Sequence, residues 1–253
     1  MKITFLGTGT SQGVPVIGCN CAVCQSENPK DKRLRCSIAI EENGKRIIID
    51  SGPDFRQQLL RENITDVDAI IYTHEHKDHV AGLDDVRPIN HFHKKDMEIY
   101  AEARVIEALK REFQYAFTAN KYPGVPQLNL HEIENKPFQV SGFEVLPVRV
   151  MHHKLPVYGF RIGNFAYITD ANYIAPEEMD KLKNLDVLVL NALRYQEHIS
   201  HYTLDEAIEV INVLKPTRAF LTHISHWLDL HEVVNKTLPP HISLAFDGFS
   251  FNV

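Results

Sequence analysis

The sequence predicts an α/β protein built as a four-layer αββα sandwich, in which two β-sheets pack face to face and helices cover the outside. Short apolar runs rich in Ile, Val, Phe and Tyr recur along the 253 residues, and such runs are typical of strands. Strands come first as a meander and then alternate with helical periodicity, and this order recurs in the second half. Two such halves favour two packed sheets over one doubly wound parallel sheet.

The expected elements follow this apolar pattern. The strands are expected at 2–6, 36–41, 45–50, 68–73, 97–101, 143–150, 157–162, 165–169, 186–191, 217–222 and 242–251. The helices are expected at 53–62, 79–88, 102–113, 176–183, 203–215 and 229–236. Asn43-Gly44 is typical of a hairpin turn, and Thr203 with Glu206 has the spacing of a helix capping box. The stretch 114–136 shows no pattern, which leaves a binding loop and a plain surface connection as alternatives.

Composition and length indicate the number of domains and the kinds of partner that the protein can attract. We expect one domain over 1–253 with a small Cys loop at about 18–36. Lys+Arg 27 against Asp+Glu 33 gives a net charge of -6, which supplies no broad attraction for nucleic acid or an anionic membrane. No stretch approaches the roughly 18 apolar residues of a spanning helix. The first residues, MKITFLGTGTS, are too Gly-rich for a signal peptide, so the sequence predicts a cytoplasmic protein.

The strongest chemical signal directly follows the expected strand 68–73. The run His74-Glu75-His76-Lys77-Asp78-His79 places four candidate metal ligands within six residues. Packing does not explain such a run, because His and Asp are rarely buried without partners. Neutral imidazoles and a carboxylate are natural ligands of a divalent cation. One short segment can therefore contribute to two neighbouring metals, and a polar surface loop is the alternative.

This run resembles the H-x-H-x-D-H signature of the metallo-β-lactamase superfamily, and the resemblance extends over nearly the whole chain. In that family further ligands come from later strand ends, where this chain has His152, Asp170 and His223. The resemblance implies that His74, His76 and His152 hold one metal, that Asp78, His79 and His223 hold the other, and that Asp170 bridges them. Spacing alone does not separate His152 from His153. Asp50 resembles an acidic residue that orients ligands in the family, although a strand-end turn explains it equally well.

A second cluster consists of Cys19, Cys21 and Cys24, with Cys36 further along. Three thiols this close favour a structural zinc, whose fourth ligand could be Cys36 or a distant His. The run GTGTSQGVPVIGCNCAVC followed by LTHISH is similar to the PhnP-like cyclic phosphodiesterases of the carbon–phosphorus lyase pathway. That resemblance implies His226 as the fourth ligand. The Gly-rich run Gly7–Gly13 lacks the features of a phosphate loop and predicts a tight turn at the rim of the site.

The resemblance implies the reaction as well. It predicts a metal-dependent phosphodiesterase acting on a small cyclic sugar phosphate, such as a ribosyl 1,2-cyclic phosphate, through a hydroxide held between two Zn or Mn ions. It places the general acid for the leaving group at His201, with Asp78 as a further catalytic residue, and it suggests a homodimer. An imidazole of near-neutral pKa suits proton donation to a departing alkoxide, while a pair of surface His residues, His198 and His201, is the alternative.

Three other functions remain open. A nuclease of the RNA-processing kind shares the fold, but the net charge argues against a polyanionic partner. Hydrolysis of thioesters or β-lactams is further away, because many such lactamases use a Cys ligand where this chain offers Asp78, His79 and His223. A non-catalytic metal-binding carrier is the third, although every ligand position of the resemblance is filled here.

Overall fold

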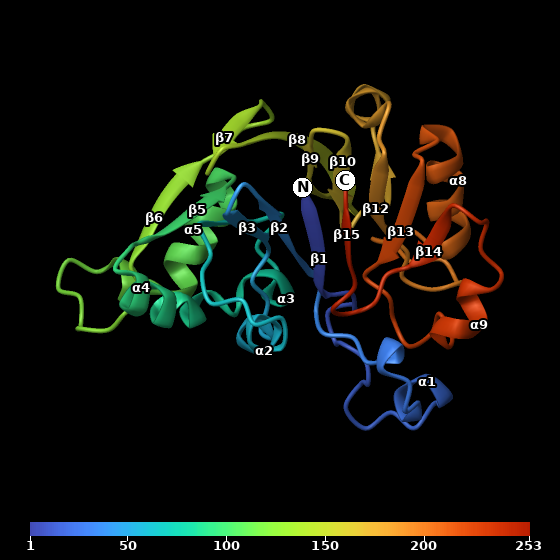
Figure 1. The fold of residues 1–253 in the computed structure, drawn as a ribbon, viewed down its shortest axis with the longest axis horizontal. Helices are drawn as coiled ribbons and strands as arrows, with labels where there is room; N and C mark the ends of the chain where they lie inside the picture. Colours follow the sequence, from blue (N-terminus) through green and yellow to red (C-terminus); the bar gives the residue numbers. More distant parts are fainter.

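Two mixed β-sheets pack face to face in the computed structural model, which describes residues 1–253 (Figure 1). The first sheet has the order β15-β1-β2-β3-β4-β5-β6, and the second has the order β11-β8-β9-β10-β12-β13-β14 with β7 paired to β8. The strands of the first sheet are β1 (Lys2–Gly7), β2 (Ser37–Glu42), β3 (Lys45–Ile49), β4 (Ala69–Ile71), β5 (Met97–Ala101), β6 (Leu128–Glu132) and β15 (Ser250–Asn252). Those of the second are β7 (Phe138–Val140), β8 (Phe143–His152), β9 (Leu155–Ile162), β10 (Phe165–Ile168), β11 (Tyr173–Ile174), β12 (Val187–Asn191), β13 (Arg218–Thr222) and β14 (Ile242–Leu244).

Helices cover the outer face of each sheet. The first half contributes α2 (Phe55–Arg61), α3 (Lys77–Val80), α4 (Arg87–His93), α5 (Ala103–Glu112) and α6 (Gln114–Phe117), and the second contributes α7 (Pro176–Met179), α8 (Leu204–Leu214) and α9 (His231–Asn235). The short helix α1 (Ala22–Gln25) lies apart from both sheets, in the Cys loop (Figure 1). Short 3-10 turns lie at Pro29–Asp31, Leu83–Val86 and Asp180–Leu182. Helix α8 begins with the expected capping box between Thr203 and Glu206. None of these helices has the length and apolar character needed to cross a membrane.

Three apolar clusters separate the four layers. One cluster, which includes Ile3, Ile47 and Phe160, fills the space between the two sheets. A second lies beneath the helices of the first sheet, around Phe55 and Leu109, and a third lies beneath those of the second sheet. The prediction of an αββα sandwich is therefore confirmed.

The strand directions bring the functional segments together. In the first sheet β3, β4, β5 and β6 are parallel, and in the second sheet β10, β12, β13 and β14 are parallel. The carboxyl ends of parallel strands meet at one edge of a sheet, which brings together the loops that follow β10 and β13. The loop that follows β4 lies at the same end of the sandwich, because Asp78 in that loop lies within 4.8 Å of Asp170 and His223, measured between their ligand atoms.

The expected strand 242–251 is wrong, because the chain changes sheets within it. Residues 242–244 form β14 of the second sheet, whereas 250–252 form β15 and pair with β1 of the first. The connection turns at Gly248, which has φ +84, and buries the carboxylate of Asp247 against the hydroxyl of Thr8 (2.8 Å) and the N–H of Leu34 (2.8 Å). These polar contacts fix a crossover that apolar periodicity does not reveal.

Two other expectations differ from the structure. The helix expected at 79–88 is divided into α3, a 3-10 turn and α4, because Gly82 packs so closely that a Cβ would lie 2.1 Å from the carbonyl oxygen of Gly52. The stretch 114–136 contains α6 and β6, and Gln127 is fixed to α4 by two hydrogen bonds with Asn90. This stretch lies at the outer edge of the first sheet (Figure 1), which favours a surface connection over a binding loop.

Candidate metal centre and active site

The segment after β4 is held against the turn after β3. A Cβ on Gly52 would lie 2.0 Å from the carbonyl oxygen of Asp78, so glycine permits this close approach. The N–H of Ser51 donates to the carbonyl of His79 over 2.8 Å. Two short segments therefore position the His-rich loop at the end of the first sheet.

The first ligand cluster consists of His74, His76 and His152, whose ligand atoms lie within 4.8 Å of one another. The Nδ1–H of His152 donates to the carbonyl of Ser200 (2.9 Å), which leaves its Nε2 lone pair free. His153 is exposed outside the cluster, so the geometry distinguishes the two residues that spacing did not. In His74 the Nδ1 lies 3.0 Å from a Thr73 hydroxyl, and Nε2 lies 3.0 Å from Nδ1 of His76.

The second cluster consists of Asp78, His79, Asp170 and His223, again with ligand atoms within 4.8 Å of one another. Nε2 of His79 lies 3.2 Å from a carboxylate oxygen of Asp78 and 3.2 Å from one of Asp170. Nε2 of His223 lies 3.1 Å from the other oxygen of Asp170. The carboxylate of Asp170 thus faces both imidazoles and also lies within 4.8 Å of the ligand atom of His152.

Asp50 sets the orientation of His79. Its carboxylate accepts from Nδ1–H of His79 (2.7 Å), from the N–H of Thr73 (2.9 Å) and from the hydroxyl of Thr73 (2.8 Å). Since the Thr73 hydroxyl donates to Asp50, it accepts from Nδ1–H of His74. His74, His79 and His152 therefore all direct an Nε2 lone pair inward, and of the two interpretations of Asp50 the structure favours the orienting one.

This donor set fits divalent cations. Nε2 of His79 and both ring nitrogens of His223 are buried without a hydrogen-bond partner. Buried polar atoms are normally paired, and lone pairs that converge with carboxylates are stabilised by a cation. Burial alone would raise the pKa of Asp170, but the neighbouring His223 and His79 hold it well below its usual range. The site therefore presents ionised carboxylates to a ligand.

His201 lies beside both clusters. Its ring centroid lies 4.6 Å from that of His152 and 4.6 Å from that of His223, and its Nδ1 is buried without a partner. Burial and the neighbouring His223 lower the pKa of His201 to about 2. The imidazole of near-neutral pKa expected from the sequence is therefore not what the structure shows, because the ring is buried among other imidazoles.

An ion pair next to the first cluster was missed from the sequence. Arg104 on α5 donates to both carboxylate oxygens of Glu75 (2.6 Å each) and to the carbonyl of Pro156 (2.7 Å). Glu75 stands between His74 and His76, so this charge-assisted contact, in which Nη1 of Arg104 faces both carboxylate oxygens, fixes the loop that carries them. No local pattern reveals it, because 29 residues separate the two partners.

The cysteine cluster closes around one imidazole. The Sγ atoms of Cys19, Cys21 and Cys24 lie 3.2, 3.4 and 3.5 Å from Nδ1 of His226. In tetrahedral zinc coordination the ligand sulfur and nitrogen atoms lie roughly 3.5 Å apart, so these residues fit the metal. A hydrogen bond from the N–H of Cys24 lowers the pKa of Cys21 to about 6, which favours the thiolate. Cys36 is outside the cluster, buried beside Thr222.

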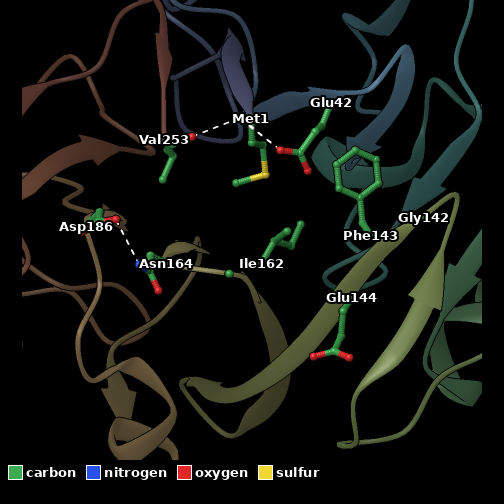
Figure 2. Close-up of a pocket in the computed structure, with 10 residues that line it drawn as sticks. Met1, Glu42, Gly142, Phe143, Glu144, Ile162, Asn164, Asp186 and Val253 are labelled. Carbon is green, nitrogen blue, oxygen red and sulfur yellow. Dashed lines mark hydrogen bonds and ion pairs between the residues drawn. The ribbon is translucent and has the colours of Figure 1, made fainter.

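A cavity of about 470 Å³ lies at the opposite end of the sheets, where the chain termini meet (Figure 2). The Met1 amino group there already contacts Glu42 (3.3 Å) and the carbonyl of Val253 (3.0 Å), and Asn164 donates to Asp186 (3.1 Å). Met1, Glu42, Asn164 and Asp186 already have polar partners there, so we assign no chemistry to it.

Comparisons with known proteins agree with this geometry. The family described as "Beta-lactamase superfamily domain" matches residues 45–224. A protein of Porphyromonas gingivalis named Octanoyltransferase is 46% identical over 251 residues, which are 98% of this chain and 51% of that protein. A Ribonuclease Z of Methanococcus maripaludis is 28% identical over 160 residues, covering 60% of this chain and 46% of that protein. The chain thus spans about half the length of these relatives.

Solved structures with the same fold also match this chain. A crystal structure described as a new diphosphatase from the PhnP family has a TM-score of 0.93 and 42% identity, covering 100% of this chain and 97% of that one. Zinc-bound PqqB from Methylobacterium extorquens has a TM-score of 0.83 at 18% identity, with full coverage of both chains, and shows the fold alone. The two sheets, the family match and these relatives together place the chain in the metallo-β-lactamase superfamily of hydrolases.

Proposed function

We propose that this protein is a metal-dependent hydrolase of phosphodiester bonds in small substrates. The observation that carries the proposal is the adjacency of two ligand clusters, one of three His and one of two Asp and two His, with Asp170 close to both. We assign His74, His76 and His152 to one cation, Asp78, His79 and His223 to a second, and Asp170 to both. When bound, the cations, Zn or Mn, supply Lewis acidity and an activated water.

The residues of the chain hold this arrangement. Asp50, Thr73 and the carbonyl of Ser200 fix the imidazole tautomers, so that three Nε2 lone pairs point inward. His201 is 8% exposed and lies at the edge of the clusters, where a leaving oxygen would depart. The negative charge of a phosphoryl group beside the ring would raise the pKa of His201 from its low value, which supports its role as the general acid.

Two substrate classes follow from the resemblance and the relatives. A small cyclic sugar phosphate, such as a ribosyl 1,2-cyclic phosphate, is the class implied by the Cys loop and the HISH segment. A diphosphate linkage is the second class, favoured by the 42% identical structure described as a diphosphatase. Both reactions place water in line with a leaving oxygen at phosphorus, so the same site serves either.

Acyl transfer receives no support from the site. The protein named Octanoyltransferase is about twice as long as this chain, and we assign its acyl transfer to the half that has no counterpart here. No reactive thiol lies at the metal clusters, because burial raises the pKa of Cys36 to about 12 and the other three thiols surround His226. A structural zinc at these three thiols and His226 completes the proposed metal content.

The proposal is tested by turnover of the Zn- or Mn-loaded protein. The substrates are a ribosyl 1,2-cyclic phosphate, a diester of diphosphate, bis(4-nitrophenyl) phosphate, a short RNA and an octanoyl thioester. Cleavage of a phosphate ester that is lost in Asp78→Ala supports the proposal. Turnover of RNA alone would favour the nuclease. Turnover of the thioester alone, or of nothing while both metals are bound, would refute the proposal.

A further inference from the structure

A small pocket opens beside His201, between the metal clusters and the cysteine cluster. It has a volume of about 170 Å³, smaller than the roughly 300–1,000 Å³ of a complete ligand pocket, so it is the size of a subsite. Its walls come from the Gly-rich turn after β1 and from the segment 193–198, and its floor comes from Ser225 and His226. The rim turn expected from the sequence at Gly7–Gly13 thus forms one wall through Thr10, Ser11 and Gln12.

The pocket is lined without any carboxylate, although the chain has 33 Asp and Glu residues. Its charged residue is Arg194, which forms no ion pair with any acidic side chain in the structure. The guanidinium donates to the carbonyls of Gln196 (3.1 Å) and Glu197 (2.8 Å) and stacks 5.0 Å from the centre of the Trp227 ring. Two backbone contacts and a ring therefore hold it in place, with Nη1 unpaired.

His198 supplies a second donor. Its Nδ1 accepts from the N–H of Ser200 over 3.3 Å, so the proton of the neutral ring is on Nε2. The ring centroid lies 5.0 Å from that of His201, which places this donor between the pocket and the reacting centre. Gln12 adds an amide to the same pocket.

We propose that the pocket of Arg194, His198 and Gln12 binds a phosphate group in the leaving part of the substrate. A fixed guanidinium and neutral N–H donors without nearby carboxylates are the chemistry that recognises a phosphate. The preferred substrate is then a diester of diphosphate. This inference deepens the proposed function and rests on it.

The reaction balances with water alone. An oxygen from water forms a bond to the phosphorus at the metal clusters, and the bond from that phosphorus to the bridging oxygen breaks. The electron pair goes to the bridging oxygen, so one phosphate monoester leaves into the pocket and a second forms at the metal clusters. The two protons of the water pass to solvent or remain on these two monoesters. The second pKa of a phosphate monoester is about 6, so this leaving group needs far less proton donation than an alkoxide. Arg194 stabilises the charge that accumulates on it.

The test compares two substrates and two non-hydrolysable probes. The substrates are P1,P2-bis(4-nitrophenyl) diphosphate and bis(4-nitrophenyl) phosphate, with products followed by phosphorus NMR. The probes are a methylene-bridged diphosphonate diester and a simple phosphonate diester, with binding to the metal-loaded protein measured by calorimetry. Arg194→Ala should lower kcat/KM for the diphosphate by about tenfold to a hundredfold and weaken the bridged probe similarly. The phosphate diester and the simple probe should change by less than about twofold.

Arg218→Ala is the matched control, because Arg218 also stacks on a ring (5.5 Å from the centre of Phe251) and donates to a backbone carbonyl. It should change neither substrate. His198→Gln should reproduce part of the selective loss. An equal loss on both substrates, or no loss, would overturn the inference. If the wild type cleaves no ester, the proposed function fails, and equal binding of both probes by the wild type and Arg194→Ala would separately overturn the subsite.

Discussion

Asp50→Asn should weaken metal binding while leaving the fold intact. Asp50 has φ 65, a left-handed backbone conformation that Asn tolerates better than most residues, so the turn after β3 can keep its shape. The side chain is fully buried and its carboxylate accepts three hydrogen bonds, from Thr73 and from Nδ1–H of His79. The substitution changes hydrogen-bond character with almost no change in volume.

An amide cannot replace the carboxylate on both sides. It offers one acceptor oxygen and one NH₂ donor, whereas Thr73 and His79 both donate to the carboxylate. The NH₂ group must therefore point at a donor of one of these two residues. If the NH₂ faces His79, that imidazole moves its proton to Nε2 and loses the lone pair that faces Asp78 and Asp170. Removal of such an orienting partner lowers metal affinity by about 10–100-fold. This corresponds to about 1.4–2.8 kcal/mol of binding free energy.

The affinity is measured by competition with a chromophoric chelator at neutral pH, with circular dichroism as a check of folding. Asp68→Asn is the control, because the carboxylate of Asp68 also accepts a backbone N–H, that of Arg46 (2.8 Å), but it precedes β4 and so lies at the end of that strand away from the ligands. It should lower thermal stability without changing metal affinity. A folded Asp50→Asn protein that binds both catalytic metals as tightly as the wild type would refute the orienting role.

Three further outcomes are expected. Cys21→Ser should remove one zinc per chain in elemental analysis and leave the other two metals, and retention of all three would contradict the assignment. His201→Gln should lower turnover of an alkyl diester by about 100-fold or more, with far less effect on a nitrophenyl diester, whose leaving group needs no proton. Burial and the adjacent Arg33 lower the pKa of His231 to about 4. Because the unfolded state binds more protons between that value and about 6.5, stability in urea should fall as the pH drops through this window. His231→Asn should flatten this slope, and an unchanged slope would contradict the cause.

Strand ends were the part of the site that sequence could predict. The resemblance to the superfamily implied Asp170 and His223 as ligands, and both residues directly follow apolar runs. Parallel strands bring their carboxyl ends to one edge of the second sheet, which is where the structure places both residues. The contacts that orient the ligands could not be predicted in this way, because they join residues that are far apart in the sequence. The carbonyl of Ser200 accepts from His152 across 48 residues, and Arg104 reaches Glu75 across 29. A backbone carbonyl has no sequence signature, and a single Arg on a helix is usually a solvated residue.

The same limit explains the crossover near the carboxyl end. The residues 242–251 are apolar enough for one strand, but the carboxylate of Asp247 is held by Thr8 and by the backbone of Leu34, far away in the chain. Burying that carboxylate without these partners would be costly, so its contacts decide where the strand ends. The periodicity of apolar residues predicts which residues are buried, but it does not predict in which sheet they are buried.

The short segment 222–227 joins the three parts of the site. It contributes His223 to the metal clusters, Ser225 to the floor of the proposed phosphate pocket and His226 to the cysteine cluster. Its backbone is fixed by Thr8 and Thr10, which exchange hydrogen bonds of 2.9 and 3.1 Å with Ile224. Because His226 is held by thiols from residues 19–24, a metal there would also hold the floor of the pocket. If the pocket binds phosphate as we propose, the cysteine cluster would therefore influence substrate binding by positioning the floor of the pocket, without contact with the reacting atoms.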